Sequence, residues 1–115
     1  MIADKSYRFA VRIVKLCQYL RIQKKEYILS QQLERSGTSI RANVAEGQQG
    51  QSMADFLAKM SIALKEITET KYWISLLHDT GYLNDREYGS IQRDCVEIER
   101  ILTSIVKSSR AKLEK

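Results

Sequence analysis

The stretch from Asp85 to Ser108, DREYGSIQRDCVEIERILTSIVKS, decides the fold. Its apolar side chains recur at alternating steps of three and four residues, at Tyr88, Ile91, Cys95, Ile98, Leu102 and Ile105. This spacing is typical of the seam along which helices pack in bundles and coiled coils. Asn84 followed by Glu87 forms a capping-box pattern at the start of the stretch. We therefore expect a helix over residues 85–108 with one face in a core.

Three further helices are predicted upstream, over residues 5–22, 27–47 and 52–80. Ser52 with Asp55 is a second capping signal, and Gly81 fits a left-handed cap at the end of the third of these helices. A glycine on the inward line of the second helix, Gly37, indicates that a neighbouring helix approaches closely there. The predicted core positions of these helices are Phe9, Ile13, Leu16, Cys17, Leu20, Leu29, Leu33, Ile40, Val44, Met53, Phe56, Met60, Ala63, Leu64, Ile67 and Ile74.

The connections between these helices are only a few residues long, which places consecutive helices side by side and antiparallel. The expected fold is all-α, an up-down-up-down four-helix bundle that forms a single domain over residues 1–115. The chain has 115 residues, no proline and five glycines. This composition excludes a sandwich of many short strands, which needs frequent turn residues.

The net charge of +5 lies entirely in the first half of the chain. Residues 1–50 carry nine basic and four acidic side chains, whereas residues 51–115 carry ten of each. Uneven basic charge favours an anionic partner. The alternative is that the charge serves solubility alone.

Candidates for catalysis, metal binding and cofactor binding are not found. Cys17 and Cys95 fall at apolar helical positions without metal-ligand spacing, so we expect two buried thiols. The single histidine, His78, lacks the glutamate three residues earlier that metal-binding bundles use, and we expect it to act at the end of its helix. No glycine-rich phosphate loop and no catalytic triad are present. We predict no enzymatic activity and no cofactor. The absence of a signal peptide or membrane span predicts a cytoplasmic location.

One sector of the first helix carries basic side chains and ends in an aromatic ring. This N-terminal basic stripe consists of Lys5, Arg8, Arg12, Lys15 and Tyr19. Such a stripe can follow a phosphate backbone, with Tyr19 available for stacking on a base. The alternative is a solvated basic face without a partner.

The helix over residues 52–80 has a second apolar stripe, formed by Ala58, Ile62, Trp73 and Leu76. The outward positions of the preceding helix, Thr38, Ala42 and Ala45, are small and would allow another helix to approach. We therefore predict self-association through these two outer faces, because a monomer rarely leaves such a patch exposed. The alternative is that helix ends and the tail cover Trp73. A polar seam (Gln32, Ser36, Ser39, Asn43 and Glu46) is expected to hydrogen-bond between helices rather than to form a ligand site.

The stretch Glu26–Gly47, EYILSQQLERSGTSIRANVAEG, resembles the signature of the bacterial family named after 23S rRNA intervening sequences, the S23 proteins. The resemblance covers roughly residues 5–108. Arg41 stands where the family usually has glycine or proline. Further matches are Ser52, Asp55 and Phe56, the stretch Ser61–Glu66, the pair Tyr72 and Trp73, and the stretch Gly81–Leu83.

This resemblance implies a homopentameric four-helix bundle without catalytic residues. It also implies similarity to the accessory protein of diversity-generating retroelements, a basic pentamer that binds nucleic acid and a reverse transcriptase. We therefore expect a homo-oligomer, and the resemblance implies that it is a pentamer. We expect it to bind structured RNA or another nucleic acid, either RNA or DNA. The predicted contacts are the N-terminal basic stripe together with Arg35 and Arg41. The alternative is a protein-interaction scaffold whose partner is another polypeptide.

Overall fold

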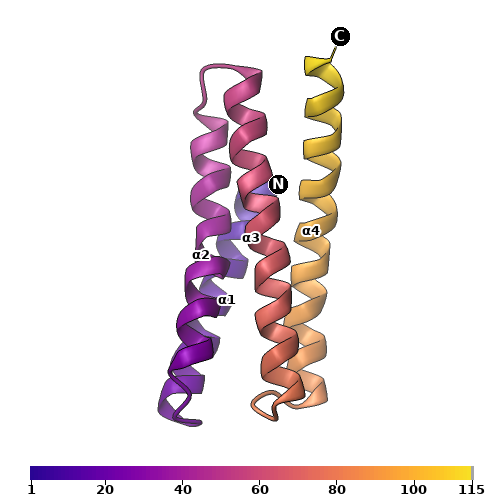
Figure 1. The fold of residues 1–115 in the computed structure, drawn as a ribbon. Coiled ribbons are helices and arrows are strands. Elements are labelled where there is room, and N and C mark those ends of the chain that lie inside the picture. Colours follow the sequence, from indigo (N-terminus) through magenta and orange to yellow (C-terminus); the bar gives the residue numbers. More distant parts are fainter. Residues whose placement is uncertain (115) are drawn as a thin grey trace.

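Four antiparallel helices run along the length of the molecule in the computed structural model, which describes residues 1–114 (Figure 1). They are α1 (Ile2–Ile22), α2 (Ile28–Gln48), α3 (Met53–Asp79) and α4 (Asp85–Leu113). Each helix packs against the next along the chain, and α1 closes the bundle against α4. The described residues contain no strand. The predicted all-α, up-down-up-down arrangement is confirmed.

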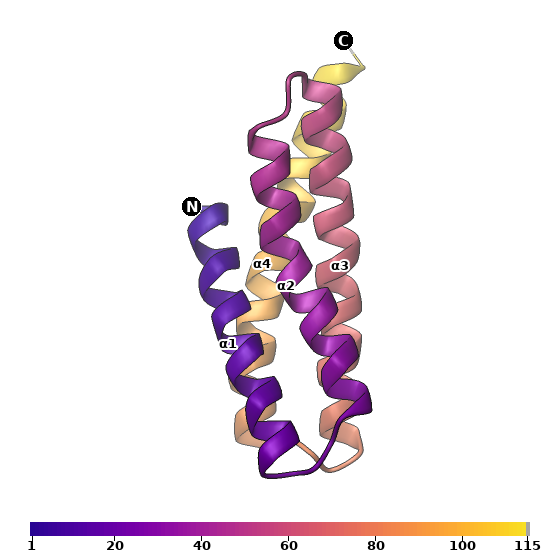
Figure 2. The same ribbon diagram turned by 90° about the vertical axis from the view of Figure 1, so that its left-hand side faces the viewer.

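The helices differ in length, so the two ends of the bundle differ. The molecule measures 50 × 21 × 21 Å, and α3 and α4 span most of its length. Figures 1 and 2 show that the N-terminus stops short of the end at which α4 finishes. At that end, α2, α3 and α4 continue without α1.

Two helix boundaries differ from the sequence prediction by more than one residue. The first helix begins at Ile2 rather than near residue 5, because Ile2 is buried against the core and the Lys5 N–H donates to the Met1 carbonyl. The last helix continues to Leu113 rather than to residue 108. Burial of Val106 and Ser109 holds this extension in place.

Three predicted cap signals are found in the structure. The Ser52 hydroxyl accepts the Asp55 N–H at 3.1 Å, and Asn84 and Glu87 form a complete capping box. Gly81 has a φ of 90°, a left-handed conformation that suits glycine, and ends α3. The N–H groups of Tyr82 and Leu83 then donate to the Leu77 carbonyl, which satisfies an acceptor that the helix leaves open.

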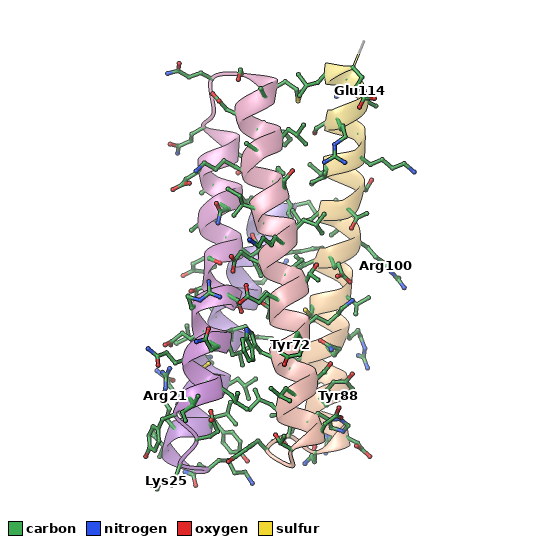
Figure 3. All side chains as sticks on the ribbon, in the orientation of Figure 1. Arg21, Lys25, Tyr72, Tyr88, Arg100 and Glu114 are labelled. Carbon is green, nitrogen blue, oxygen red and sulfur yellow. The ribbon has the colours of Figure 1, made fainter. Side chains whose placement is uncertain are left out.

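The predicted core stripes line the centre of the bundle. Side chains such as Ile13, Leu33, Ile67 and Leu102 are fully buried, and the side chains in Figure 3 fill the space between the ribbons. Leu16, Leu29, Phe56, Leu64, Tyr88 and Ile105 are only partly buried, and Met53 is exposed because it begins its helix. The polar seam of α2 meets α3: the Thr70 hydroxyl donates to Ser36 Oγ at 2.9 Å in the interior.

A glutamate in the connection before α2 caps that helix. Both Glu26 carboxylate oxygens accept backbone N–H groups, from Ile28 at 3.1 Å, Leu29 at 2.9 Å and Ser30 at 2.7 Å. The residue is only 7% exposed. Because a negative charge at a helix N-terminus also complements the helix dipole, this carboxylate stabilises the start of α2.

We expect Glu26→Ala to lower the free energy of unfolding by about 2 kcal/mol, since three backbone donors, one of them buried and two part-buried, lose their acceptor. Glu26→Gln keeps an acceptor oxygen and should cost about half as much. Urea denaturation followed by circular dichroism measures both variants. An alanine variant as stable as the wild type would contradict this role of Glu26.

Candidate nucleic-acid interface

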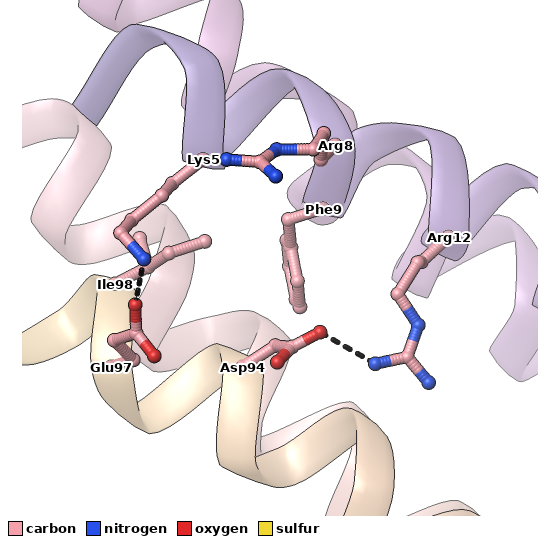
Figure 4. Close-up of a pocket in the computed structure, with 7 residues that line it drawn as sticks. All are labelled: Lys5, Arg8, Phe9, Arg12, Asp94, Glu97 and Ile98. Atoms are coloured by element: carbon pink, nitrogen blue, oxygen red, sulfur yellow. Dashed lines mark hydrogen bonds and ion pairs between the residues drawn. The ribbon is translucent and has the colours of Figure 1, made fainter. Parts of the chain in front are cut away.

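The N-terminal basic stripe lies along the contact between α1 and α4 rather than on a free surface. Lys5 forms an ion pair with Glu97, and Arg12 Nη1 lies 2.5 Å from Asp94 Oδ2 (Figure 4). Arg12 Nη2 also donates to Ser90 Oγ at 3.0 Å. Arg8 pairs with Asp4 one turn earlier, at 3.0 Å. Carboxylates therefore compensate three of the four charges in this stripe.

The remaining predicted nucleic-acid contacts do not gather on one face. Lys15 is exposed and Tyr19 is 36% exposed, both on α1. On α2, Arg35 bridges to α3 through Glu66 at 3.4 Å and Glu69 at 2.6 Å. Arg41 is half-buried, and its Nε atom has no hydrogen-bond partner. The structure thus leaves Lys15 and Tyr19 as the freest members of the predicted set.

The carboxylates of α4 are all engaged by other groups. Asp94 and Glu97 pair with α1, as described above. Glu99 accepts from Lys71 Nζ of α3 at 2.8 Å. Asp85 lies 2.7 Å from His78 Nε2, and the Glu87 side chain accepts the Asn84 N–H in the capping box. The negative charge of α4 is therefore directed toward its neighbours and its own N-terminus.

The basic side chains of α4 show the opposite arrangement. Arg86, Arg93, Arg100 and Lys107 are exposed, and none of them forms an ion pair within residues 1–114. They recur every seven residues, about 10.5 Å apart along the helix axis, on the side opposite the core positions. Figure 3 shows Arg100 pointing away from the bundle. We refer to these four residues as the α4 basic stripe.

The α4 basic stripe does not show in the net charge of the sequence, because residues 51–115 carry equal numbers of basic and acidic side chains. Net charge over a segment does not separate the two faces of a helix. The seven-residue spacing, set against the core positions of the same helix, is the signal that could have found this surface.

The predicted oligomer interface is only partly exposed. Ala42, Ala58 and Ile62 are exposed, with Ile62 at 40%, whereas Thr38 and Ala45 are half-buried. Contrary to the expectation of an outward indole, Trp73 is half-buried against the core, and its ring lies edge-on to that of Tyr72 with ring centres 4.9 Å apart. Leu76 is also half-buried. Because Trp73 follows Thr70, which faces α2, it lies on the flank of α3 beside α2 rather than on the outermost face.

A further apolar surface on α1 was not predicted. A shallow hollow on the outer side of this helix is lined by Tyr7, Ala10, Val11, Val14, Lys15 and Gln18. Tyr7 is 59% exposed and Val11 is 37% exposed. The residues that line the hollow recur at steps of three and four along α1, outside the core stripe of the same helix. This spacing could have revealed the second apolar stripe from the sequence.

The two cysteines and the single histidine, the side chains best suited to catalysis, are buried or engaged by neighbouring residues. Cys17 and Cys95 are buried, as predicted, and desolvation raises the pKa of each thiol to about 12. Both are therefore protonated at neutral pH and poor nucleophiles. His78 stacks on Tyr88 and lies between Asp85 and Asp79, whose carboxylates raise its pKa. His78 thus links the end of α3 to the start of α4.

The described part of the chain offers no group of three or more potential metal ligands. None of the four helices, over residues 1–114, is both long enough and apolar enough to cross a lipid bilayer.

Comparison with known proteins relates the chain to one family. A model of the 23S rRNA-intervening sequence protein family matches residues 1–104. A crystal structure from Bacteroides thetaiotaomicron, described as a protein of unknown function from the S23 ribosomal protein family, has a TM-score of 0.91 and 50% identity. The match covers 93% of this chain and 99% of that chain. No curated protein matches.

The similarity to retroelement accessory proteins stays a prediction. The family match spans nearly the whole bundle, and the related structure has the same fold with 50% sequence identity. This chain therefore belongs to the 23S rRNA-intervening sequence protein family.

Proposed function

We propose that the protein is a non-catalytic, homo-oligomeric nucleic-acid-binding protein whose contact surface is the α4 basic stripe. The observation that carries this proposal is the separation of charge on α4. Every carboxylate of this helix is engaged by a neighbour or a cap, whereas four exposed cations on the opposite side are unpaired within residues 1–114.

The length of the α4 basic stripe suits the phosphate backbone of a nucleic acid. From Arg86 to Lys107 the stripe extends about 31 Å, a length over which duplex DNA carries roughly 18 phosphate charges. Three of its four members are arginines, which can bind a phosphate through two parallel hydrogen bonds. The proposed contact lies on α4 rather than on α1, since carboxylates already neutralise most of the N-terminal basic stripe.

Self-association would multiply the modest charge of one subunit. Ala42, Ala58, Ile62 and Tyr72 expose small or apolar surface on α2 and α3, and we propose that these faces meet between subunits. The family resemblance implies a pentamer, and we propose this assembly for the protein. Copies held in one particle bind a long ligand with increased avidity.

Light scattering tests the assembly directly. We expect a particle several times heavier than the 13.3 kDa chain at micromolar concentration. An Ile62→Glu variant should dissociate into lighter species, because a charge would be buried at the interface. A wild-type particle of 13.3 kDa would contradict self-association.

A second candidate function is a scaffold for another polypeptide. The exposed hollow around Tyr7 and Val11 favours this alternative, because apolar surface of this kind is typical of protein-binding sites. Titration of labelled RNA against salt separates the two candidates. Nucleic-acid binding through the α4 basic stripe weakens steeply with salt. A protein that fails to bind RNA even at low salt would favour the scaffold.

A further inference from the structure

We infer that the α4 basic stripe selects double-helical over single-stranded nucleic acid and reads the backbone rather than the base sequence. This inference rests on the proposed function and deepens it, since it names the form of nucleic acid that the surface takes. Three features of the outer side of α4 support it: the lack of exposed aromatic rings, the lack of free amide side chains, and the rigidity of the helix that holds the four cations.

The first observation concerns aromatic side chains. Proteins that bind single strands combine positive charge with exposed rings on which successive bases stack. The one aromatic residue of α4, Tyr88, is half-buried and stacked on His78, with ring centres 4.2 Å apart. The exposed rings of the described chain, Tyr7, Tyr19, Tyr27 and Tyr72, belong to α1, the start of α2 and α3. The α4 basic stripe therefore has no stacking platform.

The second observation concerns base-reading groups. Asparagine and glutamine amides read adenine edges and arginine reads guanine, in each case through paired hydrogen bonds. We assign the arginines of the α4 basic stripe to phosphates, which they also bind through paired hydrogen bonds. The only amide within α4, Gln92, donates instead to Ser75 Oγ at 3.1 Å and to the Lys71 carbonyl at 3.3 Å. Between the cations, the outer face carries the small residues Gly89 and Ser104, which are both exposed. Small side chains let a phosphate backbone approach the helix without offering base-specific contacts.

The third observation concerns rigidity. The four cations are fixed on one continuous helix of 29 residues, and α4 is packed against both α1 and α3. A duplex presents phosphates on a similarly stiff scaffold. A flexible single strand would have to lose conformational freedom to follow the same line, without gaining stacking in return. Its lower charge density also releases fewer counterions for each contact.

The test uses the full-length protein and three labelled probes: an RNA duplex of about 20 base pairs, one of its component strands chosen to be unstructured, and a second duplex of unrelated sequence. Fluorescence anisotropy at 0.1 M salt measures each affinity. Four phosphate contacts predict duplex binding at least about sixfold tighter than single-strand binding, from the difference in counterion release alone. The two duplexes should bind within about threefold of each other, because no base edge is read.

The Arg93→Gln/Arg100→Gln variant links the preference to the surface. It should reduce the salt slope for the duplex by about two units, whereas Lys24→Gln/Lys65→Gln, a change of equal charge elsewhere, should leave the slope nearly unchanged. Single-strand binding as tight as duplex binding would overturn the selectivity while leaving the proposed function intact. Strong discrimination between the two duplexes would overturn backbone reading. Failure to bind any probe would overturn the proposed function itself.

Discussion

Replacing Arg86, Arg93, Arg100 and Lys107 together with glutamine should lower the affinity for an RNA duplex by about three and a half orders of magnitude at 0.1 M salt. Each lost phosphate contact removes close to one unit from the slope of log affinity against log salt, so four contacts remove about 3.6 units. The four side chains are exposed and unpaired within residues 1–114, and the fold should therefore be unaffected. Anisotropy titrations at several salt concentrations, with melting curves on the same samples, measure both properties.

The matched control removes the same charge from other surfaces. Lys15, Lys24, Lys25 and Lys65 are exposed and also lack an ion pair in the described chain. Changing all four to glutamine should reduce affinity only a few-fold, through the weaker long-range field of the protein. Equal losses in the two quadruple variants would show that net charge, and not the α4 basic stripe, governs binding.

Gly37→Leu should destabilise the bundle by more than about 3 kcal/mol, a fall in melting temperature of about 10 °C or more. A Cβ atom added at Gly37 would lie 2.8 Å from Ile13 Cγ2 and 2.9 Å from Ile13 Cγ1. Both atoms sit close to the α1 backbone and cannot swing away. The larger side chain would therefore force α1 and α2 apart and open the core around the fully buried Ile13.

Gly89→Leu is the control for this change, because it makes the same substitution on an exposed helical position. No atom lies within 4 Å of a Cβ placed at Gly89. Leucine is the better helix former, so this variant should gain up to about 1 kcal/mol. Thermal melting by circular dichroism compares the two variants. If the Gly37→Leu variant had the same melting temperature as the Gly89→Leu variant, the close contact of α1 and α2 would be refuted.

The helices and the core could be predicted from the sequence because both follow from periodicity within one segment. The steps of three and four from Ile91 to Leu102 place these side chains on one side of any helix, whatever surrounds it. Ser52, Asn84 and Gly81 likewise act on their own helix ends. Gly37 is an intermediate case: its inward position indicated a close approach, but the partner, Ile13, could be named only from the structure.

The charged surfaces could not be predicted in the same way, because pairing between helices decides which charges are free. Lys5 and Arg12 have the spacing of a solvated stripe. Only the packing of α1 beside α4 brings Glu97 and Asp94 opposite them. The same packing occupies the carboxylates of α4 and leaves Arg93 and its neighbours in the stripe uncompensated.

The surroundings of Glu26 and Trp73 could not be predicted from their own segments of the sequence. Glu26 stands in a polar connection and resembles a solvated residue, but the fold of the chain turns its carboxylate onto the first N–H groups of α2. Trp73 lies away from the central core line of α3, yet it is partly buried against the core. A helical wheel gives the direction of a side chain but not the width of the neighbour beside it.

Photo-cross-linking to an RNA duplex tests the central claim most directly. A photoreactive amino acid is placed at Ser104 on the α4 outer face, at Gln18 on α1 or at Lys24 between α1 and α2, all of which are exposed. The proposed contact surface predicts that Ser104 gives the dominant cross-link, that salt abolishes it, and that the other two positions give little. Cross-linking from Gln18 or Lys24 with none from Ser104 would contradict α4 as the nucleic-acid-binding face.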